Sequence, residues 1–163
     1  MIRHVDVTFC MRDDLYGYIS APFVFASWFA SIAIVGMNLV SDDLFLILVG
    51  VGWNLFSFIA VLLGRIIGSD KPHPDCSPWR SGDIPCGESF SVAFIATSGL
   101  AAGMMKSRPL TKRMQAALLA MLLLSPVAVV YNEFATVAGA ISGWAGGVVC
   151  GWGWTFLLHK TKV

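Results

Sequence analysis

The sequence predicts an all-α membrane protein, a polytopic bundle of about five transmembrane helices. Hydrophobic residues make up 56% of the 163 positions and charged residues only 13%, whereas a soluble domain is about half apolar and about a quarter charged. Charges and prolines also divide the chain into five apolar runs. Each run is close to the roughly 20 residues that a helix needs to cross a bilayer. We therefore expect residues 1–163 to form a single transmembrane helical domain.

A short polar segment, residues 1–16, precedes the first apolar run. It carries three aspartates and no apolar core, so it resembles neither a secretory signal nor an acid-poor transit peptide, and we expect the chain to be complete as written. The first predicted span covers about residues 17–40 and the second about 43–67. Only the acidic turn Ser41-Asp42-Asp43 separates them, which predicts a helical hairpin.

A polar loop rich in proline and glycine follows the second span and ends near Gly87. The third predicted span covers about residues 88–105 and stops at the basic turn KSRPLTKR. The fourth span covers about 112–131. It contains Pro126, which is expected to kink the helix because proline lacks the N–H of a helical hydrogen bond.

The fifth predicted span covers about residues 135–158 and is rich in small residues. Ala135, Gly139, Gly143 and Gly147 are spaced four apart. Small residues at this spacing permit close contact between helices. The pattern leaves open whether the contact is made within the bundle or with a partner.

Basic residues divide almost evenly between the two predicted faces of the membrane. The N-terminal face, which also has most of the acidic residues, carries Arg3, Arg12, Arg65, Lys71 and Arg80. The other face carries Lys106, Arg108, Lys112, Arg113, Lys160 and Lys162. This small excess of lysine and arginine favours placing the second face toward the cytoplasm or the matrix. With a net charge of +1 and no basic stripe, we expect no nucleic-acid partner.

Three polar segments are predicted to meet on the N-terminal face: GRIIGSDKP (64–72), IPCGES (84–89) and YNEFATVAGAISGWAGG (131–147). Their order resembles the three signatures of the type 2 phosphatidic-acid phosphatase superfamily, K-x6-R-P, P-S-G-H-S and S-R-x5-H-x3-D. The dolichyldiphosphatase branch is the most similar. In that branch a strand-like D-x-x-G segment precedes the first span, as Asp13-Asp14-Leu15-Tyr16-Gly17 does here. The resemblance extends over about residues 6–158 and implies a lipid-phosphatase-like helical bundle.

The chemical positions of the first two signatures are replaced in this chain. Gly64 stands where the first signature has its lysine, and Lys71-Pro72 stands for its Arg-Pro. The second signature corresponds to Pro85-Cys86-Gly87-Glu88-Ser89, with glutamate in place of histidine. A glutamate at this position would repel the phosphate that the family binds.

The third signature has lost its nucleophile. Tyr131-Asn132 replaces Ser-Arg, Ala138 stands where the nucleophilic histidine belongs, and Ser142 stands where the orienting aspartate belongs. In the family's mechanism the histidine attacks phosphorus and basic residues hold the phosphoryl oxygens. Alanine cannot attack, and asparagine lacks the charge of a bidentate arginine. The resemblance therefore implies a degenerate pseudoenzyme, and we expect no catalytic residue and no cofactor.

Several polar side chains near the N-terminal face are candidates for contact with a lipid headgroup. Glu88 has a second interpretation, because the helix dipole and the unpaired amides of a first turn favour a carboxylate there. The basic candidates also have a second interpretation, because basic residues at the ends of a span usually extend to the interface between membrane and water. The full set is Arg65, Lys71, Arg80, Glu88 and Asn132.

Cys76 and Cys86 lie in one loop and are a candidate disulfide. Such a bond would require an oxidising compartment. With His73 these cysteines make only three ligands, fewer than the four of a structural zinc site. We therefore predict no metal.

These patterns predict a non-catalytic integral membrane protein that acts as a structural or accessory subunit of a larger membrane complex and holds lipid. Its expected partners are membrane lipids and other subunits of that complex. Its expected location is an organelle, either the mitochondrial inner membrane or the endoplasmic reticulum. Two alternatives stay open. One is a divergent lipid (pyro)phosphate phosphatase that uses Glu88 or His73, and the other is a stand-alone lipid-binding regulatory pseudoenzyme.

Overall fold

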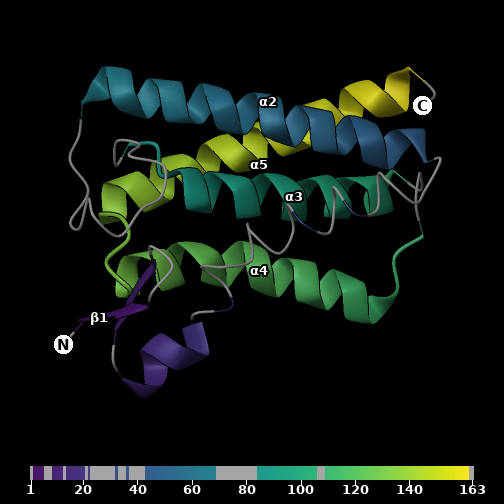
Figure 1. Cartoon of the computed structure of the whole chain (residues 1–163). Helices are drawn as coiled ribbons and strands as arrows, with labels where there is room; N and C mark the ends of the chain where they lie inside the picture. The colour runs from purple at the N-terminus through teal and green to yellow at the C-terminus, as the bar shows by residue number, and fades with distance from the viewer. Residues whose placement is uncertain are drawn as a thin grey trace.

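Four long helices make up most of the computed structural model and lie side by side (Figure 1). They are α2 (Leu44–Ile67), α3 (Gly87–Met104), α4 (Lys112–Tyr131) and α5 (Val137–Lys160). The structure describes residues 2–5, 9–12, 14–20, 22, 32, 36, 43–68, 84–105 and 109–161. Helices dominate these residues, so the mainly helical fold that the sequence predicts is confirmed.

The N-terminal segment departs from the predicted all-α fold, because it contains two antiparallel strands, β1 (Ile2–Val5) and β2 (Phe9–Arg12). The strands end before the D-x-x-G segment, and residues 15–20 are helical. Asp14 Oδ1 accepts a 2.7 Å hydrogen bond from the backbone N–H of Gly17. The expectation that D-x-x-G is strand-like is therefore wrong. An aspartate at this position caps a helix because it satisfies an amide that lacks a partner in the first turn.

Helices α2 to α5 coincide with the second to fifth predicted apolar runs, with small shifts at their ends. The local hydropathy pattern and short polar caps explain this agreement. Most of the first predicted span, residues 17–40, lies outside the described residues. Within it, residues 17–20, 22, 32 and 36 are described, and they are helical.

Side-chain caps fix where three of the helices begin. A short polar side chain just before a helix accepts a hydrogen bond from an amide of the first turn. These N-terminal bonds join Asp43 to Phe45 N at 3.1 Å, Thr111 to Met114 N at 3.3 Å and Thr136 to Gly139 N at 3.1 Å. At its other end, helix α2 stops at Gly68, whose φ of 67° lies in the left-handed region that glycine adopts without strain.

Helices α3 and α5 run parallel and touch along a row of glycines on α5. A Cβ atom on any of these glycines would overlap a backbone carbonyl of the α3 segment. The missing side chains let the two backbones approach closely. The close helix contact that the glycine spacing predicts is thus confirmed, and it is made within the chain. The contacting pairs are Gly143 with Cys86, Gly147 with Phe90 and Gly151 with Phe94.

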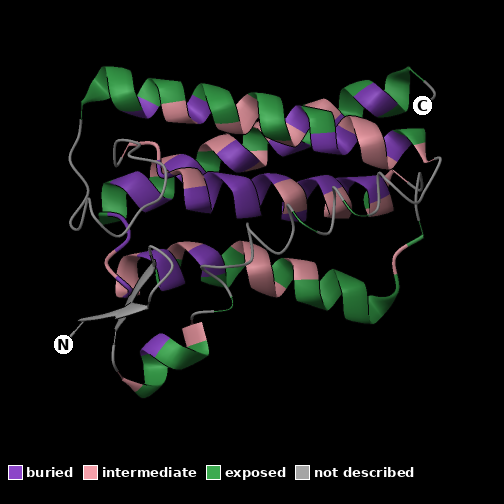
Figure 2. Ribbon diagram, in the orientation of Figure 1, coloured by how far each residue is buried: buried purple, intermediate pink, exposed green. Residues whose placement is uncertain are grey.

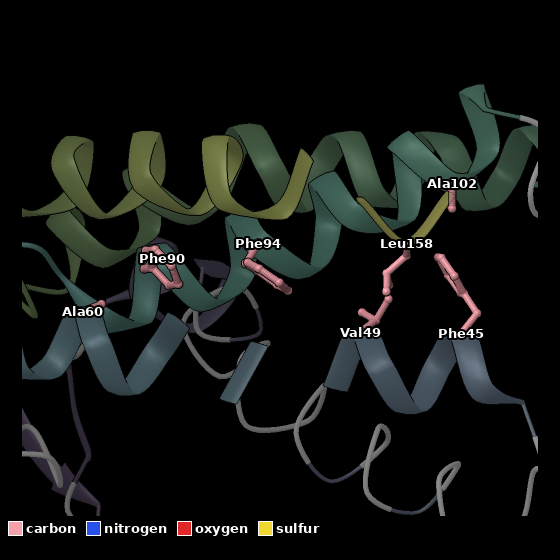
Figure 3. Packing of buried hydrophobic residues seen from close by; sticks show 7 residues of the cluster. All are labelled: Phe45, Val49, Ala60, Phe90, Phe94, Ala102 and Leu158. Atoms are coloured by element: carbon pink, nitrogen blue, oxygen red, sulfur yellow. The ribbon is translucent and has the colours of Figure 1, made fainter. Parts of the chain in front are cut away.

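Helix α2 runs in the opposite direction and packs on α3 and α5 through one apolar cluster (Figure 3). Its first turns meet the C-terminal parts of both helices, and its later turns meet the beginning of α3. Trp154 on α5 donates a hydrogen bond from Nε1 to Leu48 O at 2.9 Å. The indole fits there because Gly52 has no side chain. The cluster contains Phe45, Val49, Ala60, Phe90, Phe94, Ala102 and Leu158.

The alternating helix directions give the bundle two ends. The signature end holds Gly68, residues 84–89 and residues 131–137. The basic end holds residues 109–113 and 158–161. Between these ends α3 is the most buried helix, whereas α2 buries only 6 of its 24 residues and the first half of α4 is mostly exposed (Figure 2).

Candidate functional site

The second and third signature-like segments meet at the signature end, as the sequence predicts. The backbone N–H of Cys86 donates to Gly139 O at 3.0 Å. Cys86 is fully buried in an apolar cluster from both segments and the end of α4. Its other buried members are Ala128, Val129, Phe134, Ala135 and Ala140. Of the first segment, the structure describes only residues 64–68.

Glu88 lies in the first turn of α3 and is only 8% exposed. Its Oε2 accepts a hydrogen bond from the Cys86 thiol at 3.2 Å. This position near the positive end of the helix dipole agrees with the capping interpretation of Glu88. By residue type, the Cys86 thiol could act as a nucleophile and the Glu88 carboxylate as its base. Because Cys86 is 0% exposed, however, no substrate reaches the sulfur in this arrangement.

Asn132, which stands where the phosphatase family that the sequence resembles has an arginine, is buried and hydrogen-bonded to other groups of the protein. Its Nδ2 donates to Ser20 Oγ at 2.8 Å and to Ala128 O at 3.0 Å. The adjacent Tyr131 hydroxyl donates to Asp14 Oδ2 at 2.8 Å. We call Asp14, Ser20, Tyr131 and Asn132 the polar latch, because these side chains tie the first helical segment to the end of α4.

The polar latch is the part of this end that the sequence interpretation missed. Its partners lie more than a hundred positions apart in the chain, and spacing alone does not pair them. One signal was present, since the D-x-x-G segment has the pattern of a helix cap. The ring of Tyr16 adds an edge-on contact with Tyr131, with centroids 6.3 Å apart.

The side chains at the other two third-signature positions, Ala138 and Ser142, do not come together in a site. Ala138 is exposed at the beginning of α5. The Ser142 hydroxyl donates to Gly139 O of its own helix at 3.0 Å. Between the helices, Glu133 has a φ of 61° and closes the turn through its backbone N–H to Val130 O.

The remaining predicted site residues are only partly described. Arg65 is exposed in the last turn of α2, where a cation is favoured by the helix dipole. Lys71, Cys76 and Arg80 lie outside the described residues. Cys86 is a free thiol that donates to Glu88; because Cys76 lies outside the described residues, its disulfide with Cys86 stays a prediction.

Within the part of the chain that the structure describes, no three metal-binding side chains lie close enough to hold an ion. No family model, curated protein or solved structure matches this chain. A functional interpretation therefore depends on the packing, burial and charge of the residues themselves.

Proposed function

We propose that this chain is a non-catalytic, multi-pass integral membrane protein that acts as a structural subunit of a larger membrane assembly. Its scaffold would be of the lipid-phosphatase type, and its location an organelle, either the mitochondrial inner membrane or the endoplasmic reticulum. Lipid and neighbouring subunits would cover its apolar surface. The support comes from three features of the structure.

The first feature is the exposed apolar surface of α2 and α4. Both helices are long and apolar enough to cross a membrane, and only 22% and 17% of their most apolar windows are buried. The core helix of a soluble protein would be mostly buried. Large apolar side chains left exposed on these helices are covered without cost when the surrounding solvent is lipid. They include Val51, Leu55, Phe58, Leu62, Ile66, Leu119, Leu123 and Val127.

The second feature is the way in which the helices hold one another. Apolar burial does little to hold helices together inside a bilayer, so small residues and hydroxyl groups between helices carry the packing. The α3–α5 glycine row is one example. In addition, Ser98 Oγ donates to Gly151 O at 3.3 Å, and the hydroxyls of Ser57 and Ser91 are 3.3 Å apart.

The third feature supports the absence of catalysis and is the observation on which the proposal mainly depends. Gly143 contacts the carbonyl of Cys86 directly. A phosphoryl group would have to lie between the second and third signature-like segments. Here their backbones are in contact, and Glu88 and Asn132 are hydrogen-bonded inside the protein.

A phosphatase assay tests the absence of catalysis. Purified protein supplied with phosphatidic acid or a polyprenyl pyrophosphate is expected to release no phosphate above a detergent blank. Turnover that Glu88→Ala or His73→Ala abolishes would instead show a divergent phosphatase. Turnover that survives both substitutions would indicate a contaminating enzyme.

Co-purification tests the subunit role. The native protein, extracted in a mild detergent, is expected to migrate as part of a stable stoichiometric complex in the membrane fraction. A lone monomer would contradict this role and would favour a stand-alone lipid-binding pseudoenzyme. Fractionation of the same cells would identify the organelle.

A further inference from the structure

The basic end of the bundle carries an excess of positive charge. Among the residues that the structure describes, Lys112, Arg113 and Lys160 lie at this end, together with one acidic residue, Asp43. The structure joins the basic segments at one end because α3 and α5 run parallel: the beginning of α4 and the end of α5 both lie beside the end of α3.

The basic side chains that the structure describes at this end face solvent. Lys112 and Arg113 on α4 and Lys160 on α5 are all exposed. Asp43, the acidic residue described at this end, is used as a helix cap, because its Oδ1 accepts from Phe45 N. Its carboxylate therefore already has an acceptor role within α2.

Lys112 and Arg113 are also placed where a helix does not stabilise them. They occupy the first turn of α4, which contains no acidic residue. The helix dipole is positive there and disfavours cations. These two charges thus lower rather than raise the stability of α4 unless a nearby anion offsets them.

Lys160 lies where apolar surface meets charge. Its Nζ is 4.9 Å from the centroid of the Phe156 ring, and that ring is 45% exposed. Leu157 beside it is 51% exposed. Aromatic and basic side chains combine in this way at the boundary between acyl chains and headgroups. In a membrane-spanning chain this arrangement would bring the ammonium to the depth of the lipid phosphates.

We propose that the basic end binds the headgroups of anionic phospholipids through Lys112, Arg113 and Lys160, on the cytoplasmic or matrix side of the membrane. The inference rests on the proposed membrane-spanning function. It moves the lipid contact away from the signature end, where Glu88 and Asn132 are buried. Near an anionic surface, each added lysine or arginine strengthens binding by about fivefold.

Native mass spectrometry of the full chain tests this proposal. The protein is exchanged in detergent with equal amounts of phosphatidylcholine and phosphatidylglycerol, and the retained lipids are counted. The wild type is expected to retain more phosphatidylglycerol. The triple variant Lys112→Ala/Arg113→Ala/Lys160→Ala is expected to lose about tenfold or more of that preference. All three side chains are exposed, so the circular dichroism spectrum is expected to stay unchanged.

Two matched variants make the result specific. Arg65→Ala removes one exposed cation at the signature end and is expected to keep the wild-type preference. Lys112→Arg/Lys160→Arg keeps the charge and is expected to do the same. An unchanged preference in the triple variant, or an equal loss in Arg65→Ala, would overturn the proposal. A chain that stays soluble without detergent and retains neither lipid would instead contradict the membrane function itself.

Discussion

The indole N–H of Trp144 donates a 2.7 Å hydrogen bond to the carbonyl oxygen of Leu122. Four residues after Leu122 stands Pro126, inside α4. Proline has no N–H, so the carbonyl four residues before it loses its helical partner. Trp144 on α5 supplies that missing donor. The proline of one helix and the tryptophan of its neighbour therefore act as a pair, and α4 continues through Pro126 to Tyr131.

This pairing predicts a strong dependence between two substitutions. Trp144→Phe is expected to lower the free energy of unfolding by about 1–2 kcal/mol, because it leaves a carbonyl without a donor. In a Pro126→Ala background the new N–H satisfies Leu122, so the same change is expected to cost much less. Unfolding in sodium dodecyl sulfate, followed by circular dichroism, measures both values.

Trp152→Phe is the matched control for that cycle, because Trp152 is 42% exposed on the same helix. It is expected to have little effect in either background. If Trp144→Phe cost the same with and without Pro126, the hydrogen bond to Leu122 would not be what makes Trp144 stabilising.

The α3–α5 glycine row gives a second prediction. A Cβ atom on Gly147 would overlap Phe90 O and lie 2.8 Å from the Cβ of Ala93. These are backbone and short side-chain atoms that cannot rotate away. Gly147→Ala is therefore expected to cost about 1–3 kcal/mol of stability in the same assay. Gly153→Ala meets no atom within 4 Å and is expected to be neutral, or to stabilise by up to about 1 kcal/mol. Equal effects of the two variants would argue against a close α3–α5 contact.

The polar latch gives a third prediction. Tyr131→Phe removes the hydrogen bond to Asp14 Oδ2 but keeps the ring, so the contact with Tyr16 is preserved. A bond to a charged acceptor contributes about 1.5–3 kcal/mol, and amide exchange in residues 14–20 is expected to become faster. Tyr16→Phe is the control, since Tyr16 is 70% exposed, and it is expected to leave exchange unchanged. Exchange that did not respond to Tyr131→Phe would mean that other contacts hold this segment.

Helix positions were predictable from sequence because the deciding signals are local. The apolar runs determine the lengths of the helices. Asp43, Thr111 and Thr136 mark where helices begin, because aspartate and threonine are common N-cap residues. The partners of these helices were not predictable in the same way. The glycines on α5 indicated a close helix contact but did not show that the partner is α3. Similarly, Pro126 indicated that a backbone carbonyl loses its helical partner but did not show that Trp144 replaces it. The strands at residues 2–5 and 9–12 were missed because their short, mixed segments show no clear alternation.

The candidate site was predicted less well, and for a physical reason. Similarity of spacing located the segments that meet, but the role of each side chain depends on burial. The sequence left open whether Glu88 contacts a lipid headgroup or caps its helix, and it gave Asn132 as a headgroup candidate; in the structure both side chains are buried inside the protein. Glu88 lies next to the contact of Cys86 with Gly143 on α5, and Asn132 bonds to Ser20, which lies more than a hundred positions away in the chain. The charge of a segment, in contrast, can be counted from its residues without knowledge of the packing. The excess of lysine and arginine on one predicted face was therefore visible in the sequence.

The parallel course of α3 and α5 leads to a last prediction, on topology. If α3 crosses the membrane, the loop before it and the turn after it lie on opposite sides. An amine reagent that cannot cross sealed vesicles is therefore expected to modify Lys112 and Lys160 together, and Lys106 and Lys162 with them. Lys71, in the loop before α3, is expected to react only from the other side. Peptide mapping by mass spectrometry reads all five positions in the unmodified chain, and permeabilised vesicles show that each can react. Modification of Lys71 and Lys112 from the same side of intact vesicles would mean that α3 does not cross. In that case the two ends of the bundle would share one face of the membrane, and their difference in charge would not orient the protein.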